Sequence, residues 1–139
     1  MKTKHILVIV AMLMIFAAGF AYWQYNKPHR DASSEKAAFS MTTSELYNAF
    51  EADENAAMIK YGSQLIEVTG TIKQSTAGDD SKTMILLASE HPLFGIKTMF
   101  QTPVINPPAV GEQVVIRGFC SGINGDVELT RSTIMNVKK

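Results

Sequence analysis

Apolar residues run almost without a break near the start of the chain, whereas apolar and polar residues alternate through its second half. The apolar run from Ile6 to Trp23 is 18 residues long, about the length that an α-helix needs to cross the hydrocarbon core of a bilayer. Tyr22 and Tyr25 accompany Trp23, as in the aromatic belt of a membrane interface. The pattern predicts a membrane-spanning helix near the N-terminus.

Residues 1–26 are interpreted as an uncleaved membrane anchor, and a cleaved signal peptide is the alternative. Gly19 and Ala21 are small residues at the two positions that a signal peptidase reads, but the apolar run exceeds the roughly 7–15 residues of a signal core. Basic residues flank both ends of the run and orient it only weakly. Because short N-terminal tails usually stay inside, we expect a single-pass membrane protein with its C-terminal domain outside the cytoplasm, on the periplasmic side.

Residues 27–41 are the predicted linker, and residues 42–139 are the predicted folded domain. The stretch DASSEKAAFS is small and polar, which is typical of a flexible spacer. Thr42 to Glu45 match a capping box, in which a hydroxyl and a carboxylate satisfy free amides at the start of a helix. Asp53 is suited to cap a second short helix that runs through Lys60. The residues expected on the buried sides of these helices are Leu46, Ala49, Phe50, Ala56, Ala57 and Ile59.

The stretch IEVTGTIKQ, residues 66–74, has the period of two that is typical of a half-buried strand. Ile66, Val68 and Ile72 share one face, and polar side chains occupy the other. Gly70 falls on the apolar face, where the missing side chain permits the strong coiling of a small barrel.

Four more strands are predicted, at residues 83–88, 96–100 and 113–120 and from Val127 onward. Turn residues separate them at 77–82 and 121–126. Segment 102–112 contains three prolines, which remove backbone donors, so it is expected to be an irregular connection.

The last strand contains an irregularity, because Ile134 has the opposite parity from Val127 and Leu129. A β-bulge near Arg131–Ser132 would restore the alignment. The whole pattern predicts a mainly β fold: a five-stranded oligonucleotide/oligosaccharide-binding (OB) barrel, preceded by one or two short helices and an N-terminal transmembrane helix.

Charge and composition narrow the chemistry of the domain. From Asp31 onward there are nine Lys and Arg against thirteen Asp and Glu, a net charge of −4. This balance disfavours a nucleic-acid partner, because phosphate binding depends on clustered cations. Cys120 is the only cysteine, and the three histidines lack metal-ligand spacing. We therefore predict no metal, no cofactor and no enzymatic activity, and we interpret Glu90–His91 as loop surface rather than an acid–base pair.

Ligands of OB barrels usually bind across the face made by the second and third barrel strands. Near such a face, aromatic rings are suited to stack on bases, and cations interleaved with them are suited to hold phosphates. A plain solvated surface is the competing interpretation, since acidic residues lie in the same segments. The candidate ligand-binding residues are Lys73, Lys97, Phe100, Arg117, Phe119 and Arg131.

Several segments resemble the tRNA-anti-like family, which consists of small bacterial OB-fold proteins with an N-terminal signal or membrane anchor. The resemblance covers about Thr43 to Ile134. It is carried by the helix containing Leu46, the lead-in from Ala57 to Tyr61, and the stretches IEVTGTI, GEQVVIRGFCSG and DVELTRSTI. These motifs encode barrel packing, so the resemblance implies the OB fold and assigns no catalytic residue.

The sequence thus predicts a membrane-anchored, extracytoplasmic OB domain that acts as a binding or scaffold module. Its expected partners are the membrane, through the N-terminal helix, and an envelope protein, small ligand or glycan. A single-stranded RNA- or DNA-binding protein is the alternative, and it requires a local basic patch that the overall charge hides.

Overall fold

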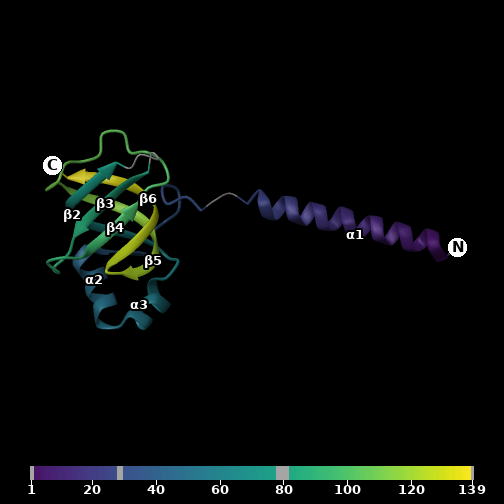
Figure 1. Ribbon diagram of the computed structural model, residues 1–139, viewed down its shortest axis with the longest axis horizontal. Helices are drawn as coiled ribbons and strands as arrows, with labels where there is room; N and C mark the ends of the chain where they lie inside the picture. The colour runs from purple at the N-terminus through teal and green to yellow at the C-terminus, as the bar shows by residue number, and fades with distance from the viewer. Residues whose placement is uncertain (1, 28–29, 78–81, 139) are drawn as a thin grey trace. The chain divides into compact units, whose positions relative to one another are not determined.

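The computed structural model describes residues 2–27, 30–77 and 82–138, and the chain divides into two units, Met1–Arg30 and Asp31–Lys139 (Figure 1). The first unit contains helix α1 (Lys2–Tyr25), none of whose described residues is buried. At 1.5 Å per residue a 24-residue helix is about 36 Å long. It is therefore long and apolar enough to cross a membrane.

The second unit is built on a closed five-stranded barrel with one extra strand. The barrel strands are β2 (Leu65–Ala77), β3 (Thr83–Ala88), β4 (Gly95–Met99), β5 (Gln113–Asn124) and β6 (Asp126–Lys138). Their order around the barrel is β2-β3-β4-β6-β5, and β5 pairs back with β2. Strands β4 and β6 are parallel, and the other barrel pairs are antiparallel. The predicted OB-type barrel is confirmed.

Strand β2 closes the barrel because it pairs with two other barrel strands, β5 and β3, along different parts of its length. Residues 65–71 pair with β5, and the register with β3 begins at Ile72. Gly70 lies just before this change of partner, with its missing side chain toward the interior. A Cβ at this position would collide with the side chain of Thr43. Gly70 therefore provides room for Thr43, the first residue of the preceding helix α2 (Thr43–Ala52), as well as for coiling.

The predicted bulge in the last strand is confirmed. The β5–β6 register passes from Arg117 opposite Thr133 to Phe119 opposite Thr130, so β6 contains one extra residue there. Arg131 occupies this position with a left-handed φ of 50°, a conformation that accompanies some bulges. Ile134 returns to the inner side and packs against the core.

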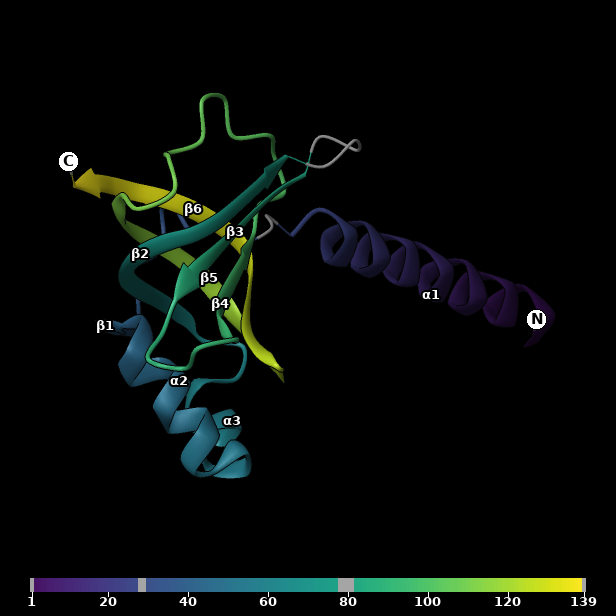
Figure 2. The ribbon, with the colours of Figure 1, turned by 60° about the vertical axis from the view of Figure 1, so that its left-hand side comes forward.

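Two short helices, α2 (Thr43–Ala52) and α3 (Glu54–Tyr61), lie at one end of the barrel (Figure 2). Thr42 and Glu45 form the predicted capping box, and Asp53 caps α3 through the amide of Ala56. The predicted burial is correct for Leu46, Phe50 and Ala57. It is wrong for Ala56 and Ile59, which are exposed, because α3 turns Ala57 and Tyr61 inward instead.

The main core joins the helices to the barrel interior. Leu46, Tyr47 and Phe50 from α2 pack among the inward-facing residues of the strands. The strand residues that are 0% exposed are Ile66, Val68, Ile85, Leu87, Ile96, Thr98, Val114, Ile116, Val127 and Leu129. A helix side thus plugs the barrel end, and the interior is filled with side chains.

The segment before the helices is more ordered than the predicted spacer. Residues Phe39–Thr42 form strand β1, which pairs in parallel with β2. Ala32 is only 1% exposed and packs with Leu65 and Phe119. The expectation of a flexible spacer misses this strand, because the residues are small and polar and their order comes from docking onto β2 and β5.

Two other predicted connections can be compared with the structure. The connection from β4 to β5 contains no helix, as expected from its prolines. The hairpin between β5 and β6 turns at Gly125, whose φ is 77°. The predicted turn at 77–82 falls largely on residues 78–81, which lie outside the described residues.

Candidate functional site

The outer face of β3 and β4 is the surface where an OB barrel is expected to bind. Because Ile85, Leu87, Ile96 and Thr98 point inward, the alternating residues of these strands point outward. Met84 lies directly opposite Met99, and Leu86 lies opposite Lys97. All four outward side chains are half-buried. The face is therefore an apolar stripe of two methionines and a leucine with one cation beside it.

Lys97, the candidate cation on this face, is held in an ion pair. Its Nζ lies 3.1 Å from Glu128 Oε1, and the two side chains are 31% and 26% exposed. The parallel register of β4 and β6 places the two residues side by side. Glu128 therefore neutralises the positive charge that Lys97 would otherwise offer to a phosphate.

The side chain of Lys73 is hydrogen-bonded to the connection between β3 and β4. Its Nζ donates hydrogen bonds to the carbonyl oxygens of Pro92, at 3.0 Å, and Leu93, at 3.2 Å. Both belong to the connection between β3 and β4. The ammonium group thus ties β2 to this connection.

Arg117 lies on the barrel wall made by β2 and β5. Its Nε donates to Glu67 Oε2 at 2.7 Å, and its Nη1 donates to the backbone oxygen of Glu35 at 3.4 Å. Glu67 Oε1 also accepts a hydrogen bond from the Ser40 hydroxyl at 3.3 Å. Arg117 therefore connects β5, β2 and the segment that precedes β1.

The two candidate aromatic residues are buried. Phe119 is 2% exposed and packs on Ala32 and Leu65, and Phe100 is 5% exposed within the main core. The guanidinium carbon of Arg131 lies 4.4 Å from the centroid of the Phe119 ring, a cation–π geometry. Neither ring presents a free face on which a base could stack in this structure.

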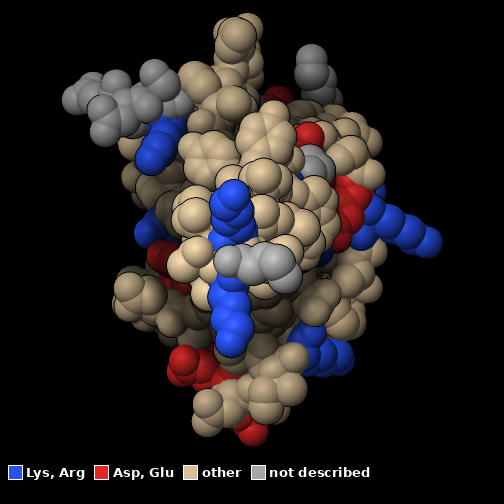
Figure 3. Space-filling view, turned by 90° about the vertical axis from the view of Figure 1, so that its right-hand side faces the viewer, with Lys and Arg blue, Asp and Glu red and all other residues tan. Residues whose placement is uncertain are grey.

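The six candidate residues consequently lie in separate places. Arg117 and Phe119 contact the segment before β1, and Arg131 lies over the Phe119 ring. Lys97 lies on the β3–β4 face, Lys73 reaches the β3–β4 connection, and Phe100 lies inside the barrel. The structure brings Phe119 and Arg131 together, but it does not assemble the set into one basic, aromatic surface. On the one face drawn in Figure 3, Lys and Arg side chains are scattered among other residues, and some lie beside acidic ones.

Sequence reasoning missed the structural role of His91. Its Nδ1 accepts hydrogen bonds from the backbone N–H groups of Leu93, at 3.2 Å, and Phe94, at 3.1 Å. Its ring stacks on Phe94, with centroids 5.0 Å apart, and lies 5.6 Å from the ring of Tyr47. A histidine directly before Pro92 in a short connection was the available signal for such a turn.

Glu90 is directed to a different partner from the histidine beside it. Its Oε2 accepts a hydrogen bond from Asn48 Nδ2 at 3.3 Å. Nδ1 of His91 accepts hydrogen bonds from two backbone N–H groups instead. Glu90 and His91 therefore shape the β3–β4 connection and do not form a hydrogen-bonded acid–base couple.

Two further titratable groups are perturbed by their surroundings. Burial raises the pKa of the Cys120 thiol, and a backbone hydrogen bond from Gly122 opposes this shift. Burial also raises the pKa of Tyr47, with added contributions from the negative charges of Glu51 and Asp126. Over the described ranges, no group of three or more His, Cys, Asp or Glu residues is placed to hold a metal ion.

Comparison with known proteins agrees with the architecture. The model of the family described as tRNA_anti-like matches residues 1–134, nearly the whole chain. No curated protein matches the sequence.

Proposed function

The chain belongs to the tRNA_anti-like family, and from this premise we propose that it is a membrane-anchored binding module that holds a protein or small-ligand partner outside the cytoplasm. The family and the OB-like barrel support a binding role. Helix α1 supports the anchor by its length and composition. The periplasmic location of the barrel is part of this proposal.

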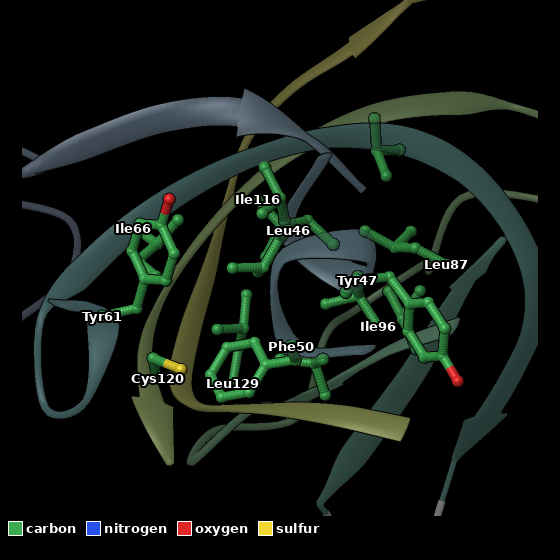
Figure 4. Packing of buried hydrophobic residues seen from close by; sticks show 14 of the residues in the cluster. Leu46, Tyr47, Phe50, Tyr61, Ile66, Leu87, Ile96, Ile116, Cys120 and Leu129 are labelled. Atoms are coloured by element: carbon green, nitrogen blue, oxygen red, sulfur yellow. The ribbon is translucent and has the colours of Figure 1, made fainter. Parts of the chain in front are cut away.

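The partner is expected to bind on the outside of the barrel. The interior is occupied by residues such as Leu46, Ile96 and Leu129 (Figure 4). A filled interior has no room for a ligand, so recognition falls to the outer surface.

The observation that carries the proposal is the chemistry of the β3–β4 face. Met84, Leu86 and Met99 offer an adaptable apolar surface, and methionine is common where proteins bind other proteins. The ion pair of Lys97 with Glu128 offers directional polar contacts without net charge. This surface suits a peptide segment or an apolar small molecule better than a polyanion.

A titration with labelled single-stranded oligonucleotide separates this proposal from nucleic-acid binding. The full-length protein in lipid nanodiscs is titrated at low and at physiological salt. Absence of binding at both salt concentrations is expected. Micromolar binding that weakens steeply with salt would overturn the proposal, because that slope reports release of counterions from phosphates.

We also propose that the domain is not an enzyme and that it lies outside the cytoplasm. Reporter fusions to the C-terminus that are active only outside or only inside the cytoplasm test the location. Activity of the inside reporter would contradict it and make nucleic acid the leading partner class. A hydrolase screen in which turnover is lost on His91→Ala would contradict the non-catalytic role.

A further inference from the structure

The connection between β4 and β5 projects from the barrel at the end opposite α2 and α3 (Figure 2, green). Its base is fixed by backbone and side-chain bonds. The N–H of Val104 donates to Thr83 Oγ1 at 3.0 Å, and that of Gly111 donates to the carbonyl of Ile72 at 2.9 Å. The six residues between these two points, 105–110, are named the loop tip.

The loop tip exposes apolar side chains. Ile105 is 87% exposed and Val110 is 65% exposed, although Val104 beside them packs against the core. The sequence contains no charged residue between Lys97 and Glu112. Loop tips of domains surrounded only by water are usually polar, so an uncharged tip with exposed Ile and Val indicates a binding surface.

Prolines reduce the number of backbone hydrogen-bond donors in this loop. Pro103, Pro107 and Pro108 have no N–H group, which removes three donors that would otherwise need partners. The N–H of Ala109 donates to Glu112 Oε2 at 2.8 Å. The loop therefore has fewer polar backbone groups to satisfy than an ordinary loop of its length.

The domain is tied to its anchor by a short stretch of chain. Helix α1 ends at Tyr25 and the second unit begins at Asp31. Whatever conformation this interval adopts, its two ends lie at most about 20 Å apart, which is the length of the fully extended chain. Residues 32–38 cannot lengthen the tether while they remain docked, through buried Ala32 and the bond from Ala38 N–H to Leu65 O at 2.8 Å.

We propose that the loop tip, residues 105–110, inserts into the interfacial region of the membrane that holds α1. This inference rests on the anchor of the proposed function. Ile105 and Val110 enter the boundary between headgroups and acyl chains, as apolar side chains of monotopic proteins do. The contact is a second attachment point that restricts the orientation of the barrel.

A bilayer fits this surface better than a protein pocket does. A protein partner usually offers donors and acceptors that match those of the loop, whereas this tip carries few donors and no charge. A single exposed loop has a small area, which is insufficient for a stable protein interface of roughly 800 Å² per partner. Beside an existing anchor, a small insertion suffices, because the tether keeps the tip at high effective concentration near the lipid.

Fluorescence in vesicles tests the proposal on the full-length protein. Ile105→Cys is labelled with an environment-sensitive NBD dye and reconstituted in phosphatidylcholine vesicles, with and without brominated phosphatidylcholine. Ile59→Cys is the matched control, because Ile59 is an isoleucine that is 88% exposed on α3. The buried native Cys120 is expected to label slowly, and labelling of the unsubstituted protein measures its share.

The expected result is a blue-shifted NBD emission at position 105 that is quenched by bromine, with neither effect at position 59. Adding Val110→Asp should reduce the quenching at position 105. Trp23, the only tryptophan, reports separately on the anchor. Quenched Trp23 with an unquenched dye at 105 would overturn the loop contact and leave the anchor standing; unquenched Trp23 would overturn both.

Discussion

The side chain of Thr43 occupies the space that a side chain at residue 70 would need, so the first residue of α2 rests directly on Gly70 of β2. The Thr43 hydroxyl also donates to the carbonyl of Ala88 at the end of β3 at 2.6 Å. Helix, first barrel strand and second barrel strand thus meet at one point.

Gly70→Ala is expected to destabilise the domain by about 1–3 kcal/mol, the usual cost of overpacking a filled core. Chemical unfolding of the full-length protein in detergent measures the effect. Thr43→Ala removes the colliding group. The loss of stability in the double variant, Gly70→Ala with Thr43→Ala, should therefore be smaller than the sum of the two single losses. Additive losses would contradict the direct contact.

Arg117→Gln is expected to loosen the segment before β1 while lowering the free energy of unfolding by about 1 kcal/mol or less, since the ion pair is partly exposed. The amide of Ala38, bonded to Leu65, should exchange its hydrogen faster. Lys97→Gln breaks the ion pair with Glu128 and is the matched control. Equal exchange at Ala38 in the two variants would refute the role of Arg117 as a clamp.

Phe119→Ala is expected to cost about 3–5 kcal/mol, as for a buried aromatic side chain. Phe119→Leu is the milder variant, to be measured if the alanine variant does not fold. Its midpoint of unfolding should also decrease. An unchanged midpoint in both variants would contradict the packing role of this ring.

His91→Ala is expected to affect one connection and leave the barrel intact. Loss of Nδ1 leaves the amides of Leu93 and Phe94 without their acceptor, so both should exchange faster. Asn48→Ala, which removes the partner of Glu90, is the control. Unchanged exchange at residues 93 and 94 would refute the assigned hydrogen bonds.

Alkaline pH is expected to weaken the domain through Cys120. Its pKa is raised above the ordinary value of 9.0, so the folded protein binds this proton more tightly than the unfolded chain does. The resulting stability is complete below pH 9.0 and is lost as the pH rises through the folded-state value. Cys120→Ala should lose less stability than the unsubstituted protein between about pH 8 and about pH 10. Tyr47 is present in both proteins and contributes equally, so parallel losses would contradict the role of the thiol.

Local signals in the sequence predicted most of the barrel. The alternation around Ile66, the capping box at Thr42 and the parity break before Ile134 each depend on neighbours a few residues away. Strand β1 escaped prediction because four residues carry too little pattern, and their pairing with β2 comes from tertiary docking. Ile59 was misplaced because the buried side of the short helix α3 is chosen by the barrel it meets.

The candidate site was harder to predict than the fold. Lys97 and Arg117 are cations at suitable strand positions, but their acidic partners come from other strands, 31 and 50 residues away along the chain. Whether a cation is available to a ligand therefore depends on strand register. No short sequence window contains that information.

The plug formed by Leu46 and Phe50 has an evolutionary consequence. With the interior filled from the helical end, folding depends little on Met84, Leu86 and Met99 on the outside. Under the binding role proposed for this face, substitutions at those outer positions would alter specificity at small cost in stability. The same proposal would allow proteins with this architecture to diverge in what they recognise while the barrel itself is preserved.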